Sequence, residues 1–332
     1  MMILRLSRGV LIPKAQYLQP SNKYSRQHDS MEFSLYKAYY VHIRQKEEEE
    51  LSIQFLENYT LAEPSITRCG TCCYRATDKE TGEKYVAKVI SIPLKANLTD
   101  ALLLSGAYPD LENVDKYYMD CAREICRQAA ILNALSHSKY FSHISNCQTA
   151  KRADIGCDVC LLYPYRLTLA TAFSRHDLTV DAAIELGITL CRGALQCREA
   201  GFLYAGIKPE NIYLTNKGHF QIGDIGFLPL STLPYCPMPG GYNTAYFPPE
   251  CRDCFSKVSP NADVYSIGAV LYQALHHGRL PDKLSDPPAN ADRGISAIIL
   301  SACATVPEMR FSTPAELLSA LEEYDSLTVK KE

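Results

Sequence analysis

The chain has 332 residues, of which 47% are hydrophobic and 21% are charged, so its composition is that of a folded globular protein and excludes wholesale disorder. At about 150 residues per domain, this length suits one large domain or two lobes. The formal net charge of −3 provides no electrostatic argument for nucleic-acid binding. No run reaches the roughly 18 apolar residues that indicate a membrane span.

The 14 cysteines are predicted to be reduced thiols of a cytoplasmic protein. The chain is not a short secreted sequence, and residues 1–10 carry two arginines inside their only apolar stretch, which argues against a signal peptide. Cys157 with Cys160, and Cys251 with Cys254, have a spacing that can bind zinc. We expect no zinc, because residues three apart on a strand point to opposite faces and the two pairs lie far apart in the chain.

The first 30 residues are basic and contain no acid before Asp29, which favours a disordered extension. A targeting segment is the alternative, since transit peptides are arginine-rich and poor in acids, and Met31 could be the true start. Residues 31–58 form a flanking segment with a short helix predicted over about 34–57.

From residue 59 onward the pattern predicts a small sheet-rich lobe and then a larger helical lobe. Residues 58–90 indicate an antiparallel sheet, with a strand over 85–90 after a polar turn over 78–83, and residues 98–113 read as an irregular insertion. The later elements expected are helices over 115–135, 182–200, 263–276, 292–304 and 314–324, and strands over 159–163, 212–214 and 220–222. The fold class is therefore α+β, with lobes at about 59–163 and 166–325 and a tail over 326–332.

The most informative segment is Tyr-Ala-Gly-Ile-Lys-Pro-Glu-Asn at residues 204–211, followed by Asp224-Ile-Gly. A strand-loop-strand with this spacing can bring Lys208, Asn211 and Asp224 together at the opening of one site. The oxygens of Asn211 and Asp224 suit Mg²⁺, which keeps phosphate as a co-ligand. A nearby lysine such as Lys208 can neutralise phosphate charge.

These residues resemble the catalytic and metal-binding loops of eukaryotic-type (Hanks-type) serine/threonine protein kinases. Further segments resemble the family in the same order over residues 59–325: Val86-Ala87-Lys88, the hinge-like Leu162-Tyr163-Pro164-Tyr165, Pro248-Pro249-Glu250, Asp263 to Gly268, and Arg310, which would pair with Glu250. The resemblance implies a two-lobed kinase fold that binds ATP and Mg²⁺. It places nucleotide contacts at Lys88, Gln128, Tyr163, Tyr165, Asn211 and Asp224, with Asn211 and Asp224 as metal ligands and Lys208 on the γ-phosphate.

The departures from the family concern catalysis. The family's His-Arg-Asp positions fall on Tyr204, Ala205 and Gly206, so the position of the base has no side chain. Losing a positioned general base costs about 10²- to 10⁴-fold in rate. Ala205 replaces the arginine that would bind a phosphate on the activation loop in the family, so control by such a phosphate is disfavoured at this site.

Two further features weaken the expected nucleotide site. The three glycine positions of the phosphate-covering loop fall on Ile66, Arg68 and Thr71, with Gly70 one position away. When His137 is aligned with the histidine that often follows this helix in the family, the position of the glutamate that pairs with the lysine falls nine residues earlier, on Gln128. Glu124 lies one turn earlier, so either residue could be the partner, and we favour Gln128.

The sequence thus predicts a pseudokinase with weak ATP and Mg²⁺ binding and a regulatory or scaffolding role toward a protein partner. One alternative is an active serine/threonine kinase that transfers the γ-phosphate to a protein substrate without the usual base, aided by Lys208. Another is a kinase-fold enzyme with altered nucleotide chemistry. We expect neither nucleic acid nor a membrane span among its partners.

Overall fold

The computed structural model describes residues 54–66, 71–93, 97–174, 178–229, 245–251, 258–259 and 261–329. The predictions for residues 1–30 and for most of the segment 31–58 therefore lie outside the described residues. The same holds for Arg68, Gly70 and Cys254.

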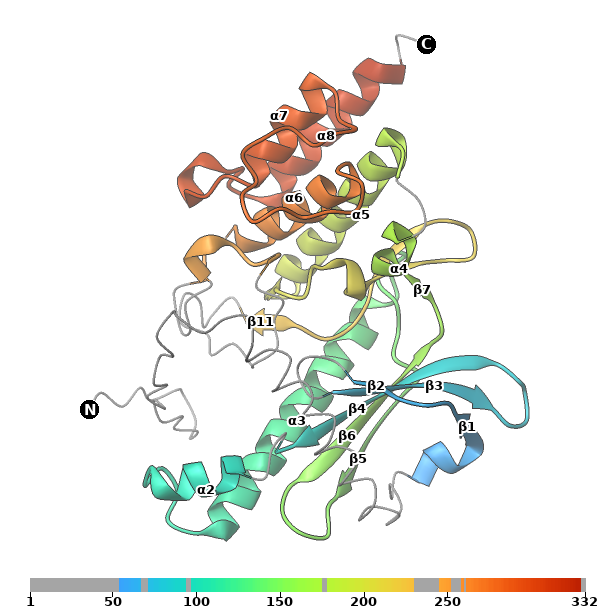
Figure 1. Ribbon diagram of the computed structural model, residues 1–332, viewed down its shortest axis with the longest axis vertical. Helices are drawn as coiled ribbons and strands as arrows, with labels where there is room; N and C mark the ends of the chain where they lie inside the picture. Colours follow the sequence, from blue (N-terminus) through green and yellow to red (C-terminus); the bar gives the residue numbers. More distant parts are fainter. Residues whose placement is uncertain are drawn as a thin grey trace, which may run out of the picture.

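The described chain forms a sheet-rich lobe followed by a mainly helical lobe (Figure 1), which confirms the predicted α+β class. The first lobe comprises η1 (Gln54–Asn58), β1 (Tyr59–Leu61), β2 (Ser65–Ile66), β3 (Cys72–Asp78), β4 (Lys84–Ile92), α2 (Asn97–Leu104), α3 (Leu111–Leu135), β5 (Asn146–Lys151) and β6 (Cys157–Pro164). The second comprises β7 (Leu167–Thr168), α4 (Leu169–Phe173), α5 (Val180–Glu199), β8 (Phe202–Tyr204), η2 (Pro209–Asn211), β9 (Ile212–Leu214), β10 (Phe220–Ile222), β11 (Phe227–Pro229), η4 (Pro249–Cys251), α6 (Ala262–Ala274), α7 (Arg293–Ala302), η5 (Pro307–Met309) and α8 (Pro314–Val329).

The sheet of the first lobe is antiparallel, in the order β1-β3-β4-β6-β5, with β2 also pairing with β3. In the β4–β6 register Lys88 lies opposite Leu161, and Val86 lies opposite Tyr163. Because side chains alternate between faces, Leu161 and Tyr163 join the core that includes α3, whereas Ala87 joins a second cluster on the other face. The register therefore places Lys88 and Tyr163 on the same side of the sheet.

Helix α3 confirms the predicted helix and begins four residues earlier, at Leu111. The carboxylate of Asp110 caps it by accepting a hydrogen bond from the backbone N–H of Asn113. The prediction that residues 98–113 are irregular is wrong, because most of α2 and the first turn of α3 fall in this range. A hydroxyl pair at 3.0 Å joins Thr99 of α2 to Tyr118 of α3 in the buried interface. This contact depends on tertiary packing, which local sequence patterns do not report.

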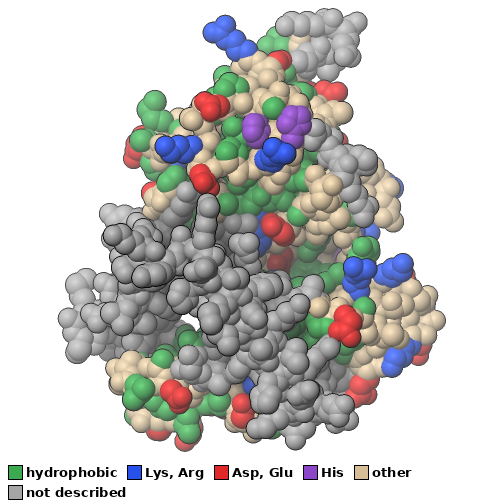
Figure 2. All heavy atoms as spheres, viewed as in Figure 1, with side chains coloured by type: hydrophobic (Ala, Val, Ile, Leu, Met, Phe, Trp, Pro, Cys, Tyr) green, Lys and Arg blue, Asp and Glu red, His purple; other side chains and the backbone are tan. Residues whose placement is uncertain are grey.

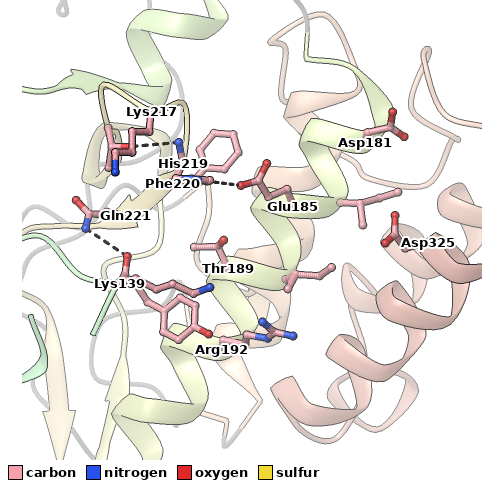
Figure 3. A pocket seen from close by; sticks show the side chains of 14 residues that line it. Lys139, Asp181, Glu185, Thr189, Arg192, Lys217, His219, Phe220, Gln221 and Asp325 are labelled. Atoms are coloured by element: carbon pink, nitrogen blue, oxygen red, sulfur yellow. Dashed lines mark hydrogen bonds and ion pairs between the residues drawn. The ribbon is translucent and has the colours of Figure 1, made fainter. Parts of the chain in front are cut away.

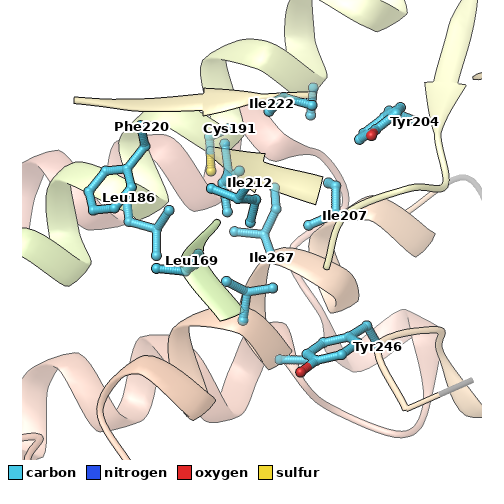
Figure 4. Packing of buried hydrophobic residues seen from close by; sticks show 14 of the residues in the cluster. Leu169, Leu186, Cys191, Tyr204, Ile207, Ile212, Phe220, Ile222, Tyr246 and Ile267 are labelled. Atoms are coloured by element: carbon cyan, nitrogen blue, oxygen red, sulfur yellow. The ribbon is translucent and has the colours of Figure 1, made fainter. Parts of the chain in front are cut away.

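In the second lobe, helix α6 is buried along almost its whole length. Asp263 of α6 is paired through both carboxylate oxygens with Arg198 of α5, at 2.7 and 2.9 Å. Figure 4 shows Ile207 and Ile212 near Ile267 in the core, so the chain on both sides of η2 is anchored to the large lobe. The predicted strands over 212–214 and 220–222 are confirmed as β9 and β10.

The structure tests two predictions about side chains, one for an ion pair and one for the direction of two cysteines. Arg310 donates to both carboxylate oxygens of Glu250 at 2.8 Å, which confirms that pair. Cys157 packs in the core that includes α3, whereas Cys160 packs in the cluster on the opposite face of the sheet. This confirms that the two thiols point to opposite faces.

The surface seen in Figure 2 carries acidic and basic side chains mixed over the described parts of both lobes. This distribution matches the small net charge of the chain. Among the described residues, no helix is both long and apolar enough to span a bilayer.

Candidate active site

The centre of the candidate site is an ion pair between the two lobes. Lys88 of β4 donates to Oδ2 of Asp224, in the loop between β10 and β11, with a Nζ–Oδ2 distance of 2.6 Å. Asp224 has φ = +70°, a left-handed conformation that aspartate tolerates better than most residues. Oδ1 of Asp224 accepts hydrogen bonds from the Tyr163 hydroxyl at 2.8 Å and from the backbone N–H of Ile225 at 2.9 Å.

The charge state of Asp224 follows from these contacts. Burial acts to raise its pKa, but Lys88 and the hydrogen bonds outweigh burial and hold the pKa below its ordinary value. Asp224 is therefore an anion at neutral pH. Three hydrogen-bond donors occupy three of the roughly four lone-pair positions of its carboxylate.

Three tyrosines, Tyr163, Tyr204 and Tyr213, surround this carboxylate. Burial, followed by the negative charge of Asp224, raises the pKa of all three hydroxyls, so each stays protonated at neutral pH. The ring of Tyr213 packs directly on Gly223, where even a Cβ would collide with it. Cys73 of β3, whose own pKa is raised by burial, also contributes to raising the pKa of Tyr213.

Gln128 has a different role from the one predicted. We expected Gln128 or Glu124 to pair with Lys88. Instead, the Gln128 side chain accepts from the backbone N–H of Phe227 and donates to its carbonyl oxygen, both at 2.7 Å. Glu124 pairs with Arg127 on its own helix. Both alternatives are wrong, because Asp224 lies closer to the lysine and Gln128 fixes α3 to the first residue of β11.

Replacing Gln128 with the glutamate found in the family should therefore destabilise the protein. In Gln128→Glu, the carboxylate would face the carbonyl oxygen of Phe227 and the Glu124 carboxylate, both of which now accept from the Gln128 amide. We expect a loss of about 1–3 kcal/mol in the free energy of unfolding at neutral pH. The loss should shrink as the pH is lowered toward about 5 and the new carboxylate becomes protonated. Urea denaturation at both pH values measures this.

Gln196→Glu is the matched control, because the amide of Gln196 on α5 forms no hydrogen bond within the described part of the chain. That change should alter stability by no more than about 0.5 kcal/mol. Equal stabilities of Gln128→Glu and the unchanged protein would contradict the structural role of the amide.

The position of the missing base is filled by an aromatic ring. The Tyr204 hydroxyl donates to the carbonyl oxygen of Gly223 at 2.6 Å, and Tyr204 is fully buried. A Cβ on Gly206 would lie 2.6 Å from both Cζ and Oη of Tyr204. The absence of a side chain at residue 206 is therefore a packing requirement of residue 204, because no real Cβ approaches an atom so closely.

Asn211 and Lys208 lie beside this loop. The Asn211 side chain is buried and donates to the carbonyl oxygen of Gly206 at 3.0 Å, while the backbone carbonyl of Asn211 accepts from the Gly223 N–H at 2.8 Å. These contacts join the loop to the segment before Asp224. Lys208 is half-buried, and within the described ranges its amine forms no hydrogen bond. Its predicted contact with a phosphate stays a prediction.

The hinge tyrosines occupy different environments. Tyr163 is buried and faces Asp224, whereas 46% of the Tyr165 surface is exposed. Two of the glycine positions of the phosphate-covering loop are described: Ile66 is the last residue of β2, and Thr71 is buried.

The groups bonded to Asp224 indicate whether ATP and Mg²⁺ fit this arrangement of residues. In protein kinases the strand lysine contacts the nucleotide phosphates and the aspartate holds the metal ion. In the 2.6 Å contact between Lys88 and Asp224, each of these two groups bonds the other, and Mg²⁺ would compete with the existing donors to the carboxylate. As arranged, with Lys88 bonded directly to Asp224, the residues do not fit the loaded cofactor.

The two-lobed fold agrees with comparisons to known proteins. The family model for the protein kinase domain matches residues 69–302, so the chain belongs to the protein kinase family. A Wee1-like protein kinase of Oryza sativa is 30% identical over 128 residues, 39% of this chain and 24% of that protein. The serine/threonine-protein kinase PknK of Mycobacterium tuberculosis is 27% identical over 175 residues, 49% of this chain and 14% of that protein. The chain thus spans a quarter or less of these relatives' length.

A separate cavity of about 460 Å³ lies in the large lobe, away from the ion pair. Its apolar wall is formed by Ile184 and Ile188 of α5. Figure 3 shows Glu185 pointing toward His219, and these two side chains pair at 3.0 Å. None of the predicted nucleotide-binding residues lines this cavity, so it does not belong to the kinase cleft.

Proposed function

We propose that this chain is a pseudokinase that regulates a partner protein through its surface rather than by phosphorylating it. The observation that carries this proposal is the packing of Tyr204 against Gly206, since the space needed for a catalytic base is taken by a buried ring. Efficient phosphoryl transfer needs a group that orients the attacking hydroxyl. No side chain at residue 206 can do so while Tyr204 is in place.

The contacts that hold the fold together are present, whereas the contacts around Lys88 and Gln128 differ from those expected for catalysis, and this difference supports the same proposal. The pair of Glu250 with Arg310 holds the large lobe together, and the buried Asp263 keeps a charged partner. The contacts that would organise catalysis differ, because Lys88 bonds Asp224 directly and Gln128 bonds the backbone. A chain that keeps the scaffold and loses the catalytic groups is suited to binding. We further infer that the kinase-like domain spans residues 59–325 of a cytoplasmic protein.

In this proposal nucleotide binds weakly. In this proposal ATP with Mg²⁺ separates Lys88 from Asp224 and displaces the Tyr213 ring, which packs on Gly223 beside Asp224. The free energy of that rearrangement is subtracted from the binding free energy. Lys88, Asn211 and Asp224 remain the groups that would contact the nucleotide and metal after such a rearrangement.

Phosphotransfer and thermal stability together test the proposal. The purified full chain is incubated with radiolabelled ATP, Mg²⁺ and casein, and its melting temperature is measured with and without millimolar ATP and Mg²⁺. We expect no label above that obtained with Lys88→Ala. We also expect the melting temperature to report a stabilisation by ATP and Mg²⁺ far below the roughly 2.7 kcal/mol that ligand at 100 times its Kd provides.

Label incorporation that requires Lys88 and Asp224 would overturn the proposal. If that incorporation were also lost in Lys208→Ala, it would favour a slow kinase aided by the half-buried amine of Lys208. A large thermal shift without incorporation would keep the pseudokinase and contradict only the weak nucleotide site.

A further inference from the structure

Two cysteines from different elements meet beside the sheet of the small lobe. The Sγ atom of Cys126 on α3 lies 3.5 Å from the Sγ atom of Cys147 on β5. Cys126 also lies 3.4 Å from the hydroxyl of Thr149, two residues along the same strand. Both cysteines are half-buried, so a small oxidant in water can reach their edge of the interface.

The distance between the two sulfurs is close to what a disulfide needs. An S–S bond is about 2.05 Å long, so the sulfur atoms need to approach by about 1.5 Å. Side-chain rotation on one helix and one strand can supply part of this movement. In a reducing compartment such a pair stays as thiols, and disulfides that do form there are generally transient and redox-sensing.

We propose that Cys126 and Cys147 are a redox-sensitive thiol pair that a hydroperoxide converts to a disulfide joining α3 to β5. In the first step the Cys126 sulfur attacks the terminal oxygen of the hydroperoxide. The O–O bond breaks, an alcohol or water leaves, and Cys126 becomes a sulfenic acid. In the second step the Cys147 sulfur attacks the Cys126 sulfur, the S–S bond forms, and the oxygen leaves as water with the Cys147 proton. Two electrons pass from the thiols to the peroxide.

The environment of the two sulfurs indicates their order of reaction. Burial, and then the neighbouring Cys126, raises the pKa of Cys147 to about 12. In the contact between the two sulfurs Cys147 is the donor and Cys126 is the acceptor, and the Thr149 hydroxyl lies against the Cys126 sulfur as well. Two hydrogen-bonding groups therefore face the Cys126 sulfur and can stabilise its thiolate, so the first oxidation falls on Cys126 and the resolving step on Cys147.

The disulfide would act on the helix that carries Gln128. Cys126 precedes Gln128 by two residues, and Gln128 holds the backbone of Phe227. A covalent bond from α3 to β5 would therefore restrain the helix that holds the first residue of β11 through Gln128. This inference concerns a different pair of side chains from the proposed function and does not depend on it.

The test treats the purified full chain with hydrogen peroxide and then with dithiothreitol. Non-reducing peptide mass spectrometry identifies the bonded cysteines, and the melting temperature is measured at each stage. We expect a peptide containing Cys126 joined to Cys147, a rise of several degrees in melting temperature, and loss of both on reduction. Hydrogen exchange of α3 should slow in the oxidised protein.

Cys126→Ser and Cys147→Ser should each abolish the cross-link and the temperature rise. Cys121→Ser is the matched control, since Cys121 is also half-buried on α3, and it should preserve both. In Cys147→Ser, Cys126 should stop at the sulfenic acid, which a dimedone probe labels. Absence of the cross-link in the unchanged protein, or a cross-link that uses a different cysteine, would overturn the proposal.

Discussion

Restoring the missing carboxylate with Gly206→Asp is expected to destabilise the protein without producing a kinase. The new Cβ would lie 2.6 Å from Cζ and Oη of the buried Tyr204 ring. Overpacking of this kind costs about 1–3 kcal/mol, and a buried carboxylate without prepared donors adds to that cost. For a domain of this size each kcal/mol lowers the melting temperature by about 2–4 °C. Calorimetry of the purified variant measures the loss.

A double-mutant cycle with Tyr204→His separates this clash from other effects. Histidine lacks the distal Cζ and Oη atoms that collide with a side chain at residue 206. The variant carrying both changes should therefore be more stable than the sum of the single changes predicts, by about 0.5–3 kcal/mol. Gly206→Ala, which adds volume without charge, should show the same coupling to Tyr204→His. Additive changes would contradict the packing argument.

The same double variant tests how much of catalysis is lost. We expect it to fold and yet to transfer no more phosphate than the unchanged chain, because Gln128 remains bonded to Phe227 and Lys88 to Asp224. Efficient transfer by the double variant would show that the base and the space for it were the only missing parts.

Local patterns in the sequence were sufficient for most of the fold. The spacing of apolar residues before Leu135 predicts one buried face of a helix, and the strand-like run around Lys88 predicts a strand. Helix α3 and strand β4 agree with these two predictions. Helix α2 escaped prediction because it is short and Leu104 at its end is 88% exposed, so its leucines do not form a buried stripe. Its position depends on the hydroxyl contact between Thr99 and Tyr118.

The candidate site was predicted at the level of which residues gather, but not of how they pair. Lys88 and Asp224 are 136 residues apart, and only the folded chain shows that they touch. Resemblance assigned Lys88 a helical partner because the family has one, whereas the actual partner is set by the conformation of Asp224. Tyr204 stands at the histidine position of the catalytic-loop motif and Tyr213 follows that motif by two residues, so these aromatic residues were the available signal. Their contacts with Gly206 and Gly223 arise only from packing.

Removing the Tyr213 ring should increase nucleotide binding. In Tyr213→Leu, the space beside Gly223 loses the aromatic ring that now packs there. Nucleotide then needs to separate only Lys88 from Asp224, so less of its binding free energy is spent on rearrangement. We expect the affinity for ATP to rise at least about tenfold, which corresponds to about 1.4 kcal/mol. Thermal shift across a series of ATP concentrations with Mg²⁺ measures the change.

Two further variants identify the cause of such a gain. Tyr213→Phe keeps the ring and removes only the hydroxyl, so its affinity should stay close to that of the unchanged chain. Adding Lys88→Ala to Tyr213→Leu should remove the gain, since Lys88 is the cation expected to meet the phosphates. If Tyr213→Phe bound ATP as well as Tyr213→Leu, the hydroxyl near Asp224 and Cys73 would be the obstacle rather than the ring. If all variants bound ATP equally, Tyr213 would not close the site, and weak binding would have to come from the direct pairing of Lys88 with Asp224 alone.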